Sequence, residues 1–372
     1  MTTIRILTSE AGNMKTASIE RPLSTKAAIL MKPMQVILEN RPLAELKPDE
    51  VLVKVMAVGV CGSDVHYYEH GRIGRKNVER PLIQGHECSG VVAAVGTNVT
   101  LVAVGDRVAV EPGISCFHCE FCKAGKYNLC PSVQFLSSPP VDGAFSEYII
   151  HPEHLLFPIP DHLTFEEATL VEPLSVGIHA CRRAGLEAGS TVLITGMGPV
   201  GLTAIIAAKA LGAGKIIVTD VEPFRLQLAG QLGAVCIHAA EQNVAEEIAS
   251  ITLGKGADMV IDTSGQAGVL DTSIELLKRG GKLVLIGFPN VERVPLNLTL
   301  MLQKEIDLYS TFRYTNTYPF GIELLASGRF NIKPLITDYY CLEDTGLALE
   351  QARTNKKASM KVIVYPNGRV SP

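Results

Sequence analysis

Four cysteines lie within the short polar segment CFHCEFCKAGKYNLC, with the spacing C-x2-C-x2-C-x7-C: Cys116, Cys119, Cys122 and Cys130. Four thiolates can hold a zinc ion in a tetrahedron with bonds of about 2.3 Å. The alternative is four unrelated thiols in one loop, but cysteine is seldom so dense without a role. Because four sulfur ligands leave no open coordination position, this segment predicts a structural metal and not a catalytic one.

A catalytic metal needs about three protein ligands and an open position. The segments VCGSDVHYY, QGHECSG and LVEPLSVGIHA supply candidates: Cys61, Ser63, Asp64, His66, His86, Glu87 and Glu172. A single Cys or His in a β-rich core more often serves packing than metal binding. Glu172 would also suit the first turn of a helix, where a carboxylate is favoured. The residues alone leave both interpretations open.

A glycine-rich turn, TGMGPVGLTA, follows the pattern G-x-G-x-x-G between an expected strand and an expected helix. Its residues are Gly196, Gly198, Pro199, Val200 and Gly201. Glycine allows the tight turn and the close approach of a pyrophosphate to the helix start. Asp220 ends the next expected strand, KIIVTD, where a carboxylate can accept the ribose hydroxyls and repel a 2'-phosphate. The pattern predicts a dinucleotide site that favours NAD, although the nearby Arg225 leaves NADP open.

The elements that would hold these residues follow two patterns. From about residue 24 to 160, apolar alternation as in VLVKVMAVGV is broken every few residues by Gly, Pro or Asp, which predicts many short strands. From about residue 189, strands at TVLITG and KIIVTD alternate with helices at PVGLTAIIAAKALGA and FRLQLAGQLGA, which predicts βαβ units on a parallel sheet. The final helices and the strand KVIVYP belong to neither pattern. We therefore expect an α/β protein of two domains.

Composition limits the classes of function. The chain has 372 residues, 47% of them hydrophobic, which is enough for two cores. Its 34 basic and 38 acidic residues are interspersed, so nucleic acid is not an expected partner. No apolar run reaches the roughly 18 residues that span a bilayer, and the first residues do not resemble an export signal. We expect a cytoplasmic protein whose nine cysteines are thiols.

Several motifs occur in an order that resembles the zinc-dependent medium-chain dehydrogenases: GHECSGVVAAVG, GDRVAVEPG, the cysteine segment, VEPLSVGIHA and TGMGPVG. Within that family, CGSDVHYYEHGRIG, SSPPVDGAF and FRYTNTYP are similar to sorbitol and other polyol dehydrogenases. The resemblance implies a GroES-like β-rich catalytic domain and a Rossmann domain with a doubly wound parallel sheet. The implied boundaries are an N-terminal arm at 1–24, the catalytic domain at 25–171, the NAD domain at 172–312 and a return to the catalytic domain at 313–372.

The resemblance also implies metal ligands. Cys61, His86 and Glu87 match the ligands of one catalytic zinc per chain, and the four-cysteine segment matches one structural zinc. Glu172 matches a position where many alcohol dehydrogenases have a cysteine ligand, and a glutamate there can bind the catalytic zinc directly or through its water. Asp64 matches the carboxylate that orients a ligand histidine through its second ring nitrogen.

The remaining implied roles concern the substrate. Ser63 matches the hydroxyl that touches the substrate oxygen, and His66 matches an imidazole that relays the proton to solvent by way of the cofactor ribose. The substrate-pocket positions are Tyr67, Phe135, Arg313 and Tyr314.

The expected activity is oxidation of a secondary hydroxyl of a polyol, such as sorbitol or xylitol, to the ketose with hydride transfer to NAD. The resemblance also implies a homotetramer. A dehydrogenase of threonine or another secondary alcohol is the alternative within the same family. A nucleotide-binding relative without enzymatic activity is a more remote alternative.

Overall fold

The computed structural model describes residues 21–74, 76–289 and 291–369. Most of the N-terminal arm expected at 1–24 therefore lies outside the described residues. Within them, the first strand already begins at Ser24. No helix in the described ranges is both long and apolar enough to cross a membrane.

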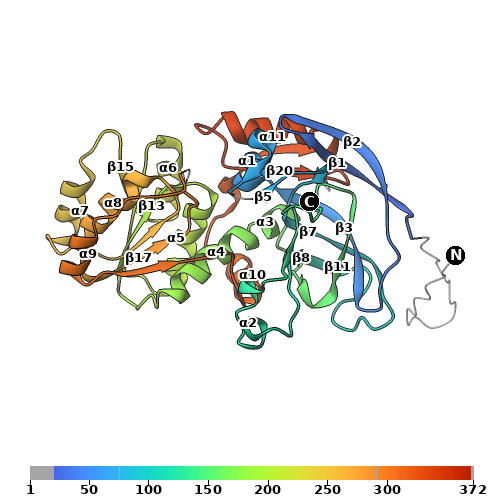
Figure 1. The fold of residues 1–372 in the computed structure, drawn as a ribbon, viewed down its shortest axis with the longest axis horizontal. Coiled ribbons are helices and arrows are strands. Elements are labelled where there is room, and N and C mark those ends of the chain that lie inside the picture. The colour runs from blue at the N-terminus through green and yellow to red at the C-terminus, as the bar shows by residue number, and fades with distance from the viewer. Residues whose placement is uncertain (1–20, 75, 290, 370–372) are drawn as a thin grey trace.

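A seven-stranded sheet forms the centre of the β-rich lobe, on the right in Figure 1. Its strands run in the order β12-β8-β7-β3-β20-β19, and β11 also pairs with β3. They are β3 (Glu50–Gly59), β7 (Glu87–Val95), β8 (Arg107–Val110), β11 (Tyr148–Pro152), β12 (Leu156–Pro158), β19 (Ile336–Cys341) and β20 (Lys361–Tyr365). Valine and isoleucine dominate these strands because branched side chains pack well on a pleated surface.

Shorter strands surround this sheet. A three-stranded sheet has the order β2-β1-β6, and two further pairs are β4 with β5 and β10 with β9. Their bounds are β1 (Ser24–Lys32), β2 (Gln35–Pro42), β4 (Arg72–Ile73), β5 (Lys76–Asn77), β6 (Leu82–Ile83), β9 (Gly113–Ile114) and β10 (Gln134–Phe135). The many short antiparallel strands agree with the predicted rhythm of residues 24–160.

The second lobe, on the left in Figure 1, contains a six-stranded sheet in the order β15-β14-β13-β16-β17-β18. Every pair in it is parallel. The strands are β13 (Thr191–Thr195), β14 (Lys215–Asp220), β15 (Val235–His238), β16 (Ala257–Asp262), β17 (Leu277–Leu285) and β18 (Asp307–Ser310). This is the strand order of a Rossmann sheet, whose crevice for a dinucleotide lies at the carboxyl ends of the central strands. The predicted fold class is confirmed.

Helices cover this sheet and join the lobes. Those of the Rossmann lobe are α5 (Pro199–Ala210), α6 (Pro223–Gln231), α7 (Val244–Thr252), α8 (Ala267–Leu276) and α9 (Leu298–Lys304). The others are α1 (Gly62–His70), α2 (Glu120–Lys123), α3 (Phe165–Thr169), α4 (Val171–Arg183), α10 (Tyr318–Ala326) and α11 (Thr345–Thr354). Four 3-10 turns are η1 (Tyr127–Leu129), η2 (Glu153–Leu155), η3 (Lys333–Leu335) and η4 (Leu342–Asp344).

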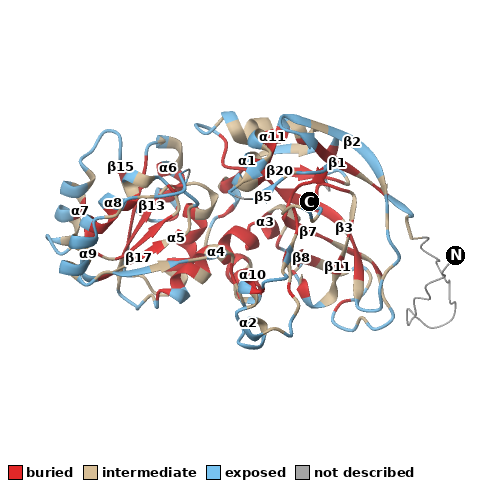
Figure 2. Cartoon of the chain, viewed as in Figure 1, coloured by how far each residue is buried: buried red, intermediate tan, exposed pale blue. Residues whose placement is uncertain are grey.

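The core is continuous between the lobes. One buried cluster includes Leu174 and Ile178 of α4, Tyr318 of α10, and Ile205 of α5. Figure 2 shows α4 and the central strands of both sheets as largely buried. A Cβ on Gly177 would lie 2.9 Å from the Cα of Ala204, so the glycine lets α4 and α5 pack closely. This packing fixes the start of α4, and with it Glu172, between the two sheets.

The C-terminal strand completes the β-rich sheet. β20 pairs with β19 on one side and with β3 on the other, where Ile363 is the partner of Gly59. Residues more than 300 positions apart in the chain thus share one sheet. The strand KVIVYP, which pattern alone left unassigned, lies next to the strand that leads into Cys61.

Candidate active site and metal centres

The four cysteines of the predicted structural site converge. Their sulfur atoms lie within 4.8 Å of one another, and all four are free thiols. The sulfurs of Cys116 and Cys122 are 3.9 Å apart, while two sulfurs on a tetrahedral zinc are separated by roughly 3.8 Å. Backbone N–H groups of Cys116 and Cys119 point at the sulfurs of Cys130 and Cys116, each at 3.4 Å. The donor set and its spacing fit a tetrahedral thiolate site.

A second possible metal site brings together Cys61, His86 and Glu87. One ligand atom from each lies within 4.8 Å of the others. Cys61 is the N-cap residue of α1, and His86 follows the left-handed Gly85 just before β7 begins at Glu87. A sulfur, an imidazole nitrogen and a carboxylate oxygen form a donor set that zinc accepts, with a fourth position left open. The residues present therefore fit a catalytic metal.

Asp64 forms hydrogen bonds with both segments that carry these ligands, the one at Cys61 and the one before His86. The carboxylate is fully buried and accepts hydrogen bonds from the backbone N–H of Cys61 (3.0 Å) and Gly85 (3.1 Å), and from the Ser137 hydroxyl (2.7 Å). Its Oδ1 lies 3.6 Å from Nδ1 of His86. Burial alone would raise the pKa of Asp64, but the His86 charge and these hydrogen bonds lower it. An ionised Asp64 can hold the imidazole ring in place.

Glu172 stands in the first turn of α4 and is buried. Its Oε1 accepts a hydrogen bond of 2.9 Å from the Tyr314 hydroxyl. Burial raises the pKa of this carboxyl to about 7. The carboxylate is not among the ligand atoms that lie within 4.8 Å of one another, so it borders the Cys61, His86 and Glu87 set without completing it.

Lys361 is a residue of this site that sequence reasoning missed. It is 1% exposed, and its Nζ lies 2.5 Å from Oε2 of Glu87 and 3.2 Å from the Val60 carbonyl oxygen. The signal in the sequence was a single lysine at the start of an otherwise apolar strand, MKVIVY. Ser137, which donates to Asp64, was missed as well, because nothing in its local sequence points to a buried partner.

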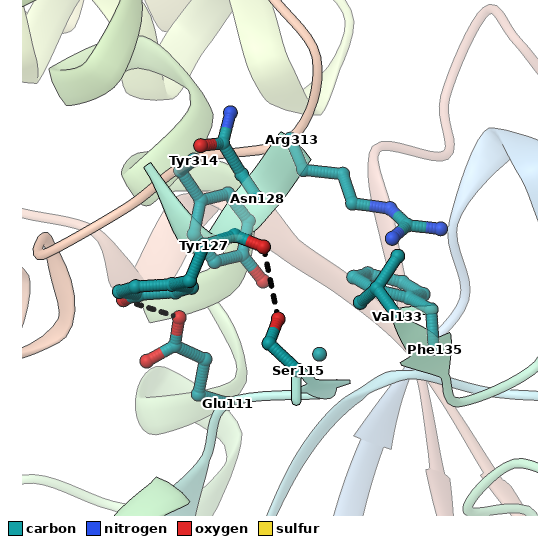
Figure 3. A pocket seen from close by; sticks show the side chains of 9 residues that line it. Glu111, Ser115, Tyr127, Asn128, Val133, Phe135, Arg313 and Tyr314 are labelled. Carbon is teal, nitrogen blue, oxygen red and sulfur yellow. Dashed lines mark hydrogen bonds between the residues drawn. The ribbon is translucent and has the colours of Figure 1, made fainter. Parts of the chain in front are cut away.

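Two of the predicted substrate positions, Phe135 and Tyr314, contact His86 and Glu172. Tyr67 and Tyr314 are buried, and the Phe135 ring lies 5.5 Å from that of His86. Figure 3 shows the Arg313 side chain against Phe135, where its guanidinium carbon is 4.0 Å from the ring centroid. The Nη1 atom of Arg313 is buried and has no hydrogen-bond partner in the described part of the chain. A polar ligand group could satisfy this nitrogen.

The two predicted proton-transfer residues share helix α1. Ser63 is partly buried, and His66 is exposed one turn further along. Partial burial and the neighbouring His70 lower the pKa of His66, so its imidazole stays neutral and can accept a proton near pH 7. The helix thus runs from Cys61 at its cap toward solvent.

The glycine-rich turn has the geometry that a dinucleotide site needs. Gly196 has a φ of 86°, and a Cβ on Gly201 would lie 1.9 Å from the Gly196 carbonyl oxygen. Gly198 caps α5, and Pro199 and Val200 form its first turn. The backbone N–H groups at this helix start lie at the carboxyl end of β13, where a pyrophosphate would be stabilised.

Asp220 ends β14 beside this turn. Its Oδ2 accepts from the Met197 backbone at 2.6 Å, and its Oδ1 accepts from Val221 and Glu222. Arg225 Nη1 lies 3.9 Å from Oδ2, and Arg225 Nε is buried and has no hydrogen-bond partner among the residues that the structure describes. An acidic side chain, Asp220, and a basic side chain, Arg225, therefore lie together at the predicted ribose position.

Sequence comparisons identify both lobes. Residues 47–161 match the alcohol dehydrogenase GroES-like domain, and residues 199–327 match the zinc-binding dehydrogenase domain. The chain therefore belongs to the zinc-dependent medium-chain dehydrogenases. It is an oxidoreductase of the zinc- and nicotinamide-dinucleotide-dependent kind.

Comparison with individual proteins shows which members of this family the chain is similar to. The chain is 53% identical over 347 residues to sorbitol dehydrogenase of Bacillus subtilis, covering 93% of this chain and 98% of that protein. It is 43% identical over 331 residues to the probable D-xylulose reductase A of Aspergillus terreus, covering 87% and 93%. The resemblance to sorbitol and related polyol dehydrogenases is confirmed.

Solved structures of similar fold hold either form of the cofactor. An alcohol dehydrogenase from E. coli CFT073, solved with NADH, has a TM-score of 0.85 and 29% identity over 92% of this chain and all of that one. A zinc-binding dehydrogenase from Sinorhizobium meliloti, bound to NADP, has a TM-score of 0.84 and 31% identity over 92% of this chain and 99% of that one. The fold therefore accepts both dinucleotides.

Proposed function

We propose that this protein oxidises a secondary hydroxyl of a polyol to the ketose and reduces NAD. The observation that carries the proposal is the convergence of Cys61, His86 and Glu87 beside the buried Glu172. The 53% identity to a sorbitol dehydrogenase over nearly the whole chain supports a polyol as the substrate.

The chain's own residues account for binding and proton transfer. When bound, zinc would supply Lewis acidity toward the substrate hydroxyl, and NAD would take up the hydride. Cys61, His86 and Glu87 would hold the metal, with Glu172 nearby in the same polar site. Ser63 would take up the substrate proton, and His66, whose ring is exposed, would return it to solvent. Arg313 and Tyr67 would bind further hydroxyls of the polyol chain.

We infer a preference for NAD over NADP from Asp220. A carboxylate at the end of β14 repels a 2'-phosphate, while Arg225 is engaged with that carboxylate at 3.9 Å. The family resemblance further implies a homotetramer, which light scattering on the purified protein would test.

A substrate panel tests the proposal. NADH formation is measured with sorbitol, xylitol, other polyols, threonine and ethanol. Turnover of polyols with NAD supports the proposal. Turnover of threonine without turnover of any polyol would instead assign the protein to the alternative substrate class, and no turnover at all would favour a non-enzymatic relative.

A further inference from the structure

The buried ion pair between Glu87 and Lys361 spans a central strand. In the order β7-β3-β20, Gly59 of β3 is the register partner of Glu87 on one side and of Ile363 on the other. The two charged side chains meet across Gly59, with Nζ and Oε2 at 2.5 Å. Each residue is 1% exposed.

Position 59 needs a glycine because the side chains of Glu87 and Lys361 occupy the space that a Cβ would fill. The backbone conformation at this position does not require a glycine. A Cβ at this position would lie 2.3 Å from Oε2 of Glu87 and 3.3 Å from Cδ of Lys361. Its φ is not in the left-handed region, so the backbone itself would accept another residue. The missing side chain leaves the space in which the ion pair forms.

Lys361 also balances charge at the site. As ligands, Cys61 and Glu87 would carry two negative charges, the ionised Asp64 beside His86 carries a third, and Glu172 adds a fourth when ionised. A divalent metal would compensate two of these charges, and Lys361 compensates one more. A charged lysine without these partners would be costly to bury.

We propose that Lys361 is a positioning residue that holds one oxygen of Glu87, so that Glu87 offers only its other oxygen to the metal. A carboxylate can bind a metal through one oxygen or through both. With Oε2 held by Lys361, a metal bound at this site would keep an open position for the substrate hydroxyl. Without Lys361, both oxygens of Glu87 could bind the metal and fill that position. The inference rests on the proposed metal site.

The test uses full-length protein in which cobalt replaces zinc, because the visible absorption of cobalt reports its coordination number. Lys361→Met is expected to keep the metal but shift the spectrum toward five-coordination. Its kcat/KM should fall about tenfold to a hundredfold, the usual effect of losing a partner of a metal ligand. Gly59→Ala is expected to give the same spectral change, because its Cβ displaces Oε2 while both charged groups remain. Gly268→Ala, where a Cβ meets nothing within 4 Å, is the control.

A double-mutant cycle separates positioning from a merely structural role. If Lys361 acts through Glu87, Lys361→Met causes no further spectral change in a Glu87→Gln background. That double variant removes both buried charges, so it also serves if Lys361→Met alone does not fold. An unchanged cobalt spectrum in Gly59→Ala and in Lys361→Met, or equal effects of Lys361→Met in both backgrounds, would overturn the inference. Wild-type protein that binds no metal at Cys61 and His86 would instead refute the proposed function.

Discussion

The buried carboxylate of Asp64 fixes the loops that carry two of the candidate metal ligands. Three hydrogen bonds fix its oxygens, and the fixed oxygens face the ring nitrogen of His86 that a metal would not use. The ligand nitrogen is therefore oriented before any metal arrives, which lowers the cost of binding.

Asp64→Asn removes the charge and keeps the size of the side chain. We expect the affinity for the catalytic metal to fall about tenfold to a hundredfold, because His86 loses the carboxylate that faces its Nδ1 atom and orients the ring. Competition with a chelator measures the affinity, and Asp161→Asn, at a fully exposed position, is the control. Equal metal retention by the Asp64 and Asp161 variants would contradict this role.

Glu111 gives a pH-dependent prediction away from the metal ligands. It is buried, its Oε1 accepts a hydrogen bond from the Tyr127 hydroxyl (Figure 3), and burial raises its pKa from 4.5 to about 7. The folded protein thus holds this proton more tightly than the unfolded chain. The stability linked to Glu111 is full below about pH 4.5 and is lost as the pH rises to about 7.

Glu111→Gln cannot ionise but keeps an acceptor for Tyr127. We expect it to exceed the wild type in stability by up to roughly 3 kcal/mol at pH 8, and by little at pH 5. Thermal unfolding at both pH values measures the difference, with the exposed Glu187→Gln as the control. A difference that does not change with pH would show that Glu111 is ionised throughout.

At the scale of elements, Gly198 and Gly201 serve different purposes in the turn between β13 and α5. A Cβ at Gly201 would meet the Gly196 carbonyl oxygen at 1.9 Å, whereas a Cβ at Gly198 would meet no atom of the described residues within 4 Å. Gly201 thus serves the packing of turn against helix, and Gly198 leaves space for a ligand.

Substituting each glycine by alanine tests this division. Gly201→Ala is expected to lower stability by about 1 to 3 kcal/mol, because it overpacks the turn, and to weaken NAD binding. Gly198→Ala is expected to leave the melting temperature unchanged and to weaken NAD binding alone. Calorimetry measures both quantities. A Gly198 variant with normal NAD affinity would show that the cofactor does not approach this turn.

The cysteine segment gives a second prediction for an element. Cys122→Ser removes one of four sulfur ligands, so we expect the zinc content to fall by one ion per chain and the melting temperature to fall by several degrees. The zinc at the Cys61 site should remain. Metal analysis of the purified variant measures the loss, and Cys341→Ser, an exposed thiol outside both sites, is the control. Loss of both metals would show that the two sites are not independent.

At the scale of the whole molecule, the sequence predicted what is local or repeated. The alternation of strands and helices after residue 189 predicted β13, α5, β14 and α6 closely, because each is set by its own apolar period. The four-cysteine segment was predicted from its spacing, which is chemically distinctive, whereas Cys61, His86 and Glu87 were implied by the resemblance to a known family.

What could not be predicted depends on distant pairing. Lys361 joins the site only because β20 crosses back to pair with β3, about 300 residues away in the chain. The space above Gly59 can hold the Glu87–Lys361 ion pair only when β7 and β20 lie on either side of β3. No local pattern carries that information, because sheet order is decided by the packing of the complete fold.

The most direct test of the central claim combines metal removal with turnover. The wild-type protein is stripped of metal, reloaded with zinc, and assayed for NADH formation with sorbitol and xylitol beside a Cys61→Ala variant. We predict two zinc ions per wild-type chain and zinc-dependent oxidation of polyols, with one zinc and no turnover in the variant. Polyol oxidation that survives metal removal or the loss of Cys61 would contradict this prediction.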